Sequence, residues 1–262
     1  MSDHGRWIWY ELMSPDTAAS KRFYGDLVGW ACEDMPGSDG GYAIFQTPEA
    51  GAGVGGLMPL SDEHKAAGIP PNWTGYVCVD DCDAAALKAL KLGGSVMRQP
   101  EDIPGIGRFA VVADPAGAPF AIMKPIPPEK PGPQAAPGAL GTVGWHELYG
   151  LAPEQGFDFY AELFGWKRDE ALDMGPMGKY QLYSNQDGQV GAMMKKPDQV
   201  PVAYWNFYVR VGDIDAAAAR AKAGGAQIMM GPMEVPGGDW VFSTVDPQGA
   251  VFSAMGAKAL SL

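Results

Sequence analysis

The sequence predicts an α+β fold built from two copies of one unit, and three observations lead to this prediction. Short motifs recur in the same order: Trp9-Tyr-Glu-Leu12 returns as Trp145-His-Glu-Leu148, and Asp114-Pro-Ala-Gly117 returns as Asp246-Pro-Gln-Gly249. With 36 glycines and 23 prolines among 262 residues, the chain favours short strands and tight turns over a helical bundle. A proline-rich segment separates the two copies.

That segment, residues 125–139, is predicted to be an extended linker. Six prolines within it are incompatible with a helix or an inner strand, and they make the chain fairly stiff. Two domains are therefore expected, one at residues 1–124 and one at residues 140–262.

Each copy is predicted to contain two βαβββ modules. In the first module, Ser14 or Asp16 caps a helix that ends near Gly29. In the second module, Asp81 or Asp83 caps another helix. The expected strands of the first copy are 8–13, 41–46, 53–59, 74–79, 95–98, 108–113 and 119–124, and its second helix is 84–92. Because the second copy repeats this pattern, the chain should hold four such modules.

Composition excludes several classes of function. The net charge of −12 repels phosphate backbones, so nucleic acid is not an expected partner. No run of about 18 apolar residues could span a membrane, and the N-terminal residues lack the apolar core of a signal peptide. Three cysteines (Cys32, Cys78 and Cys82) are interpreted as reduced thiols, so the cytoplasm is the expected compartment.

The order of elements and the repeated motifs resemble the vicinal oxygen chelate superfamily, which includes glyoxalase I, bleomycin-resistance proteins, fosfomycin-resistance enzymes and extradiol dioxygenases. The motifs that carry the resemblance are Phe23-Tyr24 followed by Gly29-Trp30, then Gly93-Gly94, then Asp114-Pro-x-Gly117, each with its equivalent in the second copy. The resemblance implies that the two modules of a copy curl their sheets into an open cup around a ligand. Two glyoxalase-like cup domains are therefore expected.

Enzymes of this superfamily usually hold a divalent metal through His, Glu or Gln on the first and fourth strands of each module. Carried over by strand, these positions fall on Trp9, Gly56, Thr74, Ala121, Trp145, Ala192, Asn206 and Ser253. None of these residues is a good metal ligand. We therefore expect no metal and no other cofactor. His146 is expected to point toward the helix side, as a buried, hydrogen-bonded structural residue.

Strand alternation indicates which residues face the cups. Glu11 lies on the same face as Trp9, and Glu147 lies on the same face as Trp145, so both carboxylates are candidate catalytic residues. Each could instead make a structural hydrogen bond or an ion pair. The candidate ligand-binding residues are Trp9, Thr74, Tyr76, Trp145, Asn206 and Tyr208. Three arginines without counterparts in the other copy (Arg98, Arg108 and Arg210) could hold an anionic group.

Three functions remain open. The first is metal-free binding of a small aromatic or amine-bearing molecule, of the bleomycin-resistance type. The second is an enzyme of the glyoxalase or dioxygenase type, acting as lyase, isomerase or oxygenase with Glu11 or Glu147 as general base. The third is a structural or partner-binding protein with vestigial cups. The expected partner is a small-molecule ligand, and the expected state is a monomer or homodimer.

Overall fold

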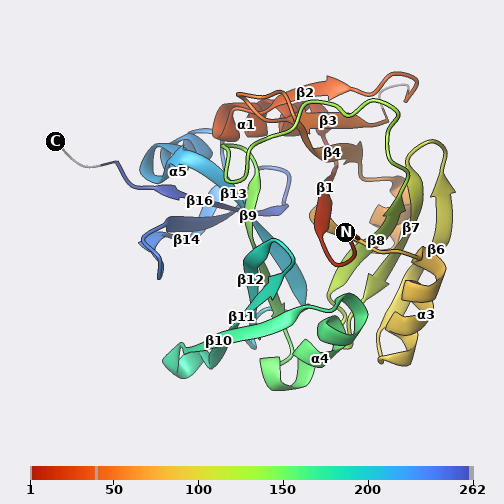
Figure 1. Cartoon of the computed structure of the whole chain (residues 1–262). Coiled ribbons are helices and arrows are strands. Elements are labelled where there is room, and N and C mark those ends of the chain that lie inside the picture. Colours follow the sequence, from red (N-terminus) through yellow and green to blue (C-terminus); the bar gives the residue numbers. More distant parts are fainter. Residues whose placement is uncertain (1, 39–40, 260–262) are drawn as a thin grey trace. The chain divides into compact units, whose positions relative to one another are not determined.

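The computed structural model describes residues 2–38 and 41–259, and it confirms an α+β fold of four βαβββ modules (Figure 1). The first copy contains β1 (Trp7–Ser14), α1 (Thr17–Val28), β2 (Ala31–Asp34), β3 (Ala43–Gln46), β4 (Gly53–Pro59), α2 (Asp62–Ala66), β5 (Asn72–Cys78), α3 (Cys82–Lys91), β6 (Ser95–Ile103), β7 (Gly107–Ala113) and β8 (Pro119–Pro125).

The second copy repeats this order. It contains β9 (Val143–Gly150), α4 (Pro153–Phe164), β10 (Lys167–Asp173), the short 3-10 helix η1 (Gly175–Met177), β11 (Lys179–Asn185), β12 (Gly188–Lys195), β13 (Tyr204–Asp213), α5 (Ile214–Ala223), β14 (Gln227–Glu234), β15 (Trp240–Val245) and β16 (Val251–Ala257).

The strands of each copy belong to one eight-stranded sheet, and the four modules share one pairing rule. The first strand of a module runs parallel to its fourth strand. Equivalent residues are partners in this register: Glu11 with Gly56, Tyr76 with Ala121, Glu147 with Ala192, and Tyr208 with Ser253. Side chains of paired residues share a face of the sheet, so the register places these residues on equivalent faces.

Two compact units divide the chain in a different way from the sheets. The first unit consists of the residues up to Trp9 together with 74–131 and 145–206, so it holds the second and third modules. The second unit consists of 10–73, 132–144 and the residues from 207 onward, so it holds the first and fourth modules. The domain boundaries at 1–124 and 140–262 stay a prediction, because the sheets follow them and the compact units do not.

The second unit is held together by two of the repeated motifs. The Tyr24 hydroxyl on α1 donates a hydrogen bond to Asp246 Oδ2 over 2.8 Å, and Trp73 Nε1 donates to that hydroxyl over 3.0 Å. The other oxygen of Asp246 accepts the backbone N–H groups of Gln248 and Ala250, which closes the Asp-Pro-x-Gly turn. The turn of the fourth module is thereby bonded to the helix of the first.

The first unit repeats the same arrangement with the equivalent residues. Tyr160 on α4 donates to Asp114 Oδ2 over 3.0 Å, and Trp205 Nε1 donates to Tyr160 over 3.2 Å. In each unit, therefore, a helix tyrosine from one copy pairs with a turn aspartate from the other copy. Both motifs have a structural role in the core.

Local signals account for most element boundaries. Asp16 caps α1 and Asp81 caps α3, which settles the two alternatives that the sequence left open. Strand β2 was missing from the expected strands because its four residues lie mostly exposed and show no apolar alternation. In the described part of the chain, no helix is both long enough and apolar enough to cross a membrane.

Candidate functional site

Glu147 is the centre of a buried polar cluster in the first unit. It lies on β9, and only 5% of its surface is exposed. The Tyr180 hydroxyl, from β11, donates a hydrogen bond to the Glu147 carboxylate. The same hydroxyl accepts a hydrogen bond from Trp145 Nε1 over 2.9 Å. Trp145, Tyr180 and Glu147 thus form a chain of hydrogen bonds that ends on the carboxylate.

Two further tyrosines lie near this carboxylate. Tyr149, at the end of β9, stacks on Tyr204, at the start of β13, with ring centroids 5.1 Å apart and planes inclined by 15°. Burial and the negative charge of Glu147 raise the pKa of Tyr204 to about 12. The same two causes raise the pKa of Tyr180 well above its ordinary value. Both phenols therefore keep their protons at neutral pH.

Asn206 belongs to the same region. It follows Tyr204 by two residues on β13, so both side chains point to one face of the strand, and Asn206 is buried. We refer to Trp145, Glu147, Tyr149, Tyr180, Tyr204 and Asn206 as the Glu147 site. Three of the predicted residues, Trp145, Glu147 and Asn206, lie in it.

Sequence reasoning missed the three tyrosines, although signals for them existed. Tyr149 continues the alternation of Trp145 and Glu147, and Tyr204 precedes Asn206 by two residues. Tyr180 has an equivalent in Tyr42, because each lies two residues before the strand position that pairs with Ala192 or Gly56. Only Tyr180 has an aromatic equivalent in the first copy, since Tyr149 and Tyr204 correspond to Met13 and Asn72. The signal for Tyr149 and Tyr204 was therefore the alternation within the second copy.

The predicted site residues of the first copy that lie in the first unit have a different environment. Trp9 packs against an apolar cluster of Tyr76, Phe109, Ala121 and Met123, all of them buried. The rings of Tyr76 and Phe109 lie 6.2 Å apart. Thr74 lies half-buried on the same strand as Tyr76. Trp9 and Tyr76 therefore contribute to the hydrophobic core.

The second unit holds the remaining two predicted residues, Glu11 and Tyr208. Glu11 is half-buried on β1 and pairs in register with Gly56. The Tyr42 phenol lies so close over Gly56 that a Cβ on that residue would overlap with its hydroxyl. Tyr208 is buried and pairs in register with Ser253, whose hydroxyl lies 2.7 Å from that of Ser243. Glu11 and Glu147 thus belong to different compact units.

The side chains at the expected metal positions do not fit a divalent metal. The Trp145 indole N–H is bonded to Tyr180, Tyr42 occupies the space over Gly56, and Ala121 and Ala192 carry no ligand atom. Within residues 2–38 and 41–259, no three His, Cys, Asp or Glu side chains gather as a metal-binding group would require.

His146 lies in a separate aromatic cluster of the first unit. Its ring stacks on Trp7, with centroids 4.8 Å apart and planes inclined by 7°, and its Nδ1 lies 2.8 Å from the Val190 carbonyl oxygen. Burial lowers the pKa of His146 to about 4. The ring is therefore neutral at neutral pH, as expected for a buried structural histidine.

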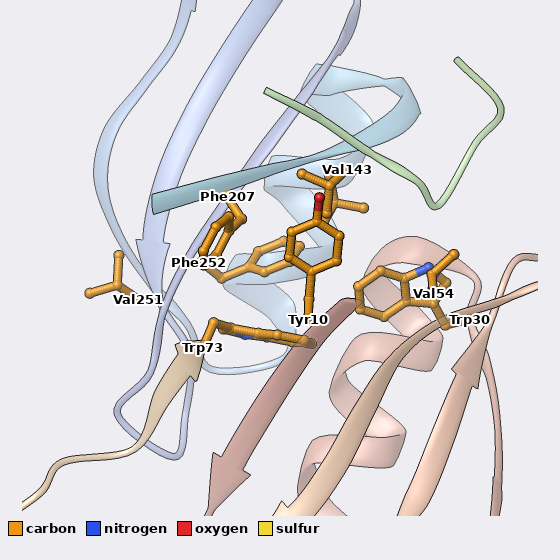
Figure 2. Close-up of a pocket in the computed structure, with 9 residues that line it drawn as sticks. Tyr10, Trp30, Val54, Trp73, Val143, Phe207, Val251 and Phe252 are labelled. Carbon is orange, nitrogen blue, oxygen red and sulfur yellow. The ribbon is translucent and has the colours of Figure 1, made fainter. Parts of the chain in front are cut away.

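One small cavity lies in the second unit, and its volume of about 10 Å³ suffices for about one water molecule. Figure 2 shows the Tyr10 ring between Trp30, Trp73 and Phe207, with aliphatic side chains around them. Small-molecule sites are usually about 300–1,000 Å³. This cavity is a packing defect of the core and is too small for an organic ligand.

Four βαβββ modules in two eight-stranded sheets define a glyoxalase-like fold, and comparison with known proteins agrees. Residues 143–253 match the model of the Glyoxalase/Bleomycin resistance protein/Dioxygenase superfamily, and residues 9–123 match a glyoxalase-like domain model. The "Putative glyoxylase CFP32" of Mycobacterium tuberculosis is 31% identical, with 94% of this chain and 93% of that protein covered. The chain belongs to this superfamily, which is also called the vicinal oxygen chelate superfamily.

Other relatives and solved structures extend the comparison. The anthracycline biosynthesis protein DnrV of Streptomyces peucetius is 32% identical, with 94% of this chain and 91% of that protein covered. The Mn(II)-bound glyoxalase from Novosphingobium aromaticivorans superposes with a TM-score of 0.63 at 18% identity, covering 98% of this chain and 83% of that one. The 2,2',3-trihydroxybiphenyl 1,2-dioxygenase of Sphingomonas wittichii superposes with a TM-score of 0.66 at 14% identity, covering 98% of this chain and 91% of that one. At these identities the structures show the fold alone.

Proposed function

We propose that the chain binds a small aromatic, amine-bearing molecule at the Glu147 site. The observation that carries this proposal is a nearly buried carboxylate that accepts a hydrogen bond from Tyr180 and raises the pKa of Tyr204, on which Tyr149 stacks. A buried carboxylate attracts an ammonium group, and the faces of aromatic rings stabilise a cation by about 0.5–2 kcal/mol each. The same rings offer stacking surface to an aromatic ligand.

Two other facts support a ligand of this kind. The net charge of −12 favours the approach of cations. Among the relatives, DnrV is named as an anthracycline biosynthesis protein, and anthracyclines are flat aromatic molecules. The cytoplasm remains the proposed compartment, and the free thiols of Cys32, Cys78 and Cys82 fit a reducing environment.

An enzyme is the second candidate, and the hydrogen bond between Tyr180 and Glu147 favours it. A carboxylate can accept a proton from a substrate carbon or hydroxyl. Once Glu147 is protonated, the Tyr180 O–H that it had accepted can turn to the developing oxyanion and donate a hydrogen bond there. In this reading Glu147 is the general base and Tyr180 the donor. A third reading gives Glu147 a structural role within the Trp145–Tyr180 chain.

Binding assays can separate these functions. The probes are an anthracycline with a free amino group and its N-acetylated derivative, which keeps the rings and loses the positive charge. We expect the wild-type protein to bind the free amine at least tenfold more tightly. Glu147→Gln should remove most of that preference. Exposed Glu170→Gln, which makes the same change of charge in the same unit, should not.

The contrary results are equally specific. Equal binding of both probes by the wild type would refute the amine-binding proposal. Conversion of the probe to a new product, abolished in Glu147→Gln and Tyr180→Phe, would favour the enzyme. A large loss of melting temperature in Glu147→Gln, with no probe bound by the wild type, would favour the structural role.

A further inference from the structure

Arg210 lies on β13 in the second unit, two residues beyond Tyr208, so the two side chains share a face of the strand. The backbone of Arg210 is fixed by the segment that precedes β9. Its N–H donates to the Thr142 carbonyl over 2.8 Å, and its carbonyl accepts the Gly141 N–H over 2.8 Å. The side chain is 31% exposed, so solvent reaches the guanidinium.

The chain makes room for this guanidinium at Gly144. A Cβ on Gly144 would lie 2.6 Å from Arg210 Nε and 2.7 Å from Met255 Sδ, closer than real side chains approach. Arg210 also pairs in register with Met255. We call Gly144, Arg210 and Met255 the Arg210 corner. The arginine and the methionine thus occupy the space that a side chain at residue 144 would take.

The first copy has no charge at the equivalent corner. Its residues are Ile8, Cys78 and Met123, and Ile8 and Met123 belong to the packed apolar cluster of the first unit. Apolar side chains are thus sufficient to fill this corner. The second copy replaces an isoleucine by glycine and a cysteine by arginine, which lowers apolar burial and introduces a cation. Packing alone does not explain that exchange.

The guanidinium has donors available for a ligand. Among the described residues its side chain makes one ion pair, with Asp239 at 3.9 Å, which is too long for a hydrogen bond. By contrast, the Arg108 guanidinium donates two hydrogen bonds to the Asp83 carboxylate, over 2.6 and 2.8 Å. A loosely held, half-exposed arginine in a pre-shaped corner can exchange Asp239 for another carboxylate.

We propose that the Arg210 corner binds the carboxylate group of a small organic acid. The planar guanidinium offers two parallel N–H groups to the two oxygens of a carboxylate. This site is independent of the Glu147 site, since its residues lie in the other compact unit. Failure of either proposal therefore leaves the other untouched.

The test is an NMR titration of the full-length, ¹⁵N-labelled protein that observes the arginine Nε–H signals. Benzoate is the probe, and benzamide is the uncharged probe of the same shape. We expect benzoate to shift the Arg210 signal, which is identified by its absence from Arg210→Met, and benzamide to leave it in place. Asp239→Asn should tighten benzoate binding by roughly threefold to tenfold, since it removes the competing charge. Exposed Arg22→Met, also in the second unit, should bind benzoate as the wild type does.

Three results would overturn the proposal. One is an Arg210 signal that does not move with benzoate in the wild type or in Asp239→Asn. Another is equal binding of benzoate by folded Arg210→Met, with folding checked by circular dichroism. The third is tighter binding of inorganic phosphate than of benzoate at Arg210, which would exclude carboxylate as the preferred group. The wild-type and Asp239→Asn measurements remain decisive if Arg210→Met does not fold.

Discussion

The Tyr24 hydroxyl donates a 2.8 Å hydrogen bond to Asp246, and this bond joins the helix of the first module to the turn of the fourth. Tyr24 is fully buried, and Asp246 is 4% exposed. The equivalent bond between Tyr160 and Asp114 joins the third module to the second. The two motifs that repeat most clearly in the sequence therefore meet across the copies within each compact unit.

Removing this hydroxyl should destabilise the second unit. In Tyr24→Phe, Asp246 loses a buried donor and the Trp73 indole N–H loses its acceptor. We expect unfolding to become easier by about 1–3 kcal/mol, measured by urea denaturation. In a double-mutant cycle, Tyr24→Phe with Asp246→Asn should cost clearly less than the sum of the single changes. Additive costs would show that the bond contributes little.

Stability should fall between pH 6.5 and pH 4 because of His146. The pKa of His146 is about 4 in the folded protein and about 6.5 in the unfolded chain. Between these two pH values the unfolded chain binds a proton at His146 and the folded protein does not. The contribution is present above pH 6.5 and is lost as the pH falls through 4, by up to about 3 kcal/mol. Urea denaturation at several pH values measures it.

The control for that experiment is His146→Phe, which keeps a ring against Trp7 and cannot titrate. Burial raises the pKa of Asp114 and Asp246, so their contributions have the opposite sign, being present at low pH and lost as the pH rises. The wild-type protein and His146→Phe both contain these two aspartates, so the contributions of the aspartates cancel in the comparison. The difference between the two pH profiles isolates His146, and identical profiles would contradict the prediction.

Gly56 should not tolerate a side chain. In Gly56→Ala the new methyl group would overlap with the Tyr42 phenol, which must then move. We expect a loss of about 1–3 kcal/mol in unfolding free energy. Gly132→Ala is the matched control, because a Cβ there meets nothing within 4 Å. Equal stability of the two variants would mean that Tyr42 relocates without cost.

Metal removal should change neither stability nor binding. The expected ligand positions of the family carry Trp, Gly, Thr, Ala, Asn and Ser in this chain. Dialysis against EDTA should therefore leave the melting temperature and the affinity for the free-amine anthracycline unchanged. One equivalent of bound Zn, Ni, Fe or Mn by elemental analysis, lost on Glu147→Gln, would contradict this expectation.

The sequence alone determined most of the order of elements, since the signals for it are local. Asp16 and Asp81 bond the backbone of their own helices, and alternation placed Glu147 on the face of Trp145 because side chains on a strand point to opposite sides in turn. Strand β2 was not predicted from the sequence, because a short, exposed edge strand needs no apolar pattern.

Only the tertiary structure decided which modules pair. Two equivalent turn aspartates, Asp114 and Asp246, could accept the hydrogen bond from Tyr24. In both turns the aspartate accepts the backbone N–H of the alanine four residues later, so local hydrogen bonding does not distinguish them. The choice depends on the packing of α1 against α5, which joins residues more than 180 positions apart and leaves no local trace. Tyr180 and Tyr204 likewise reach Glu147 from other strands, so the composition of the site follows from the register of the sheet.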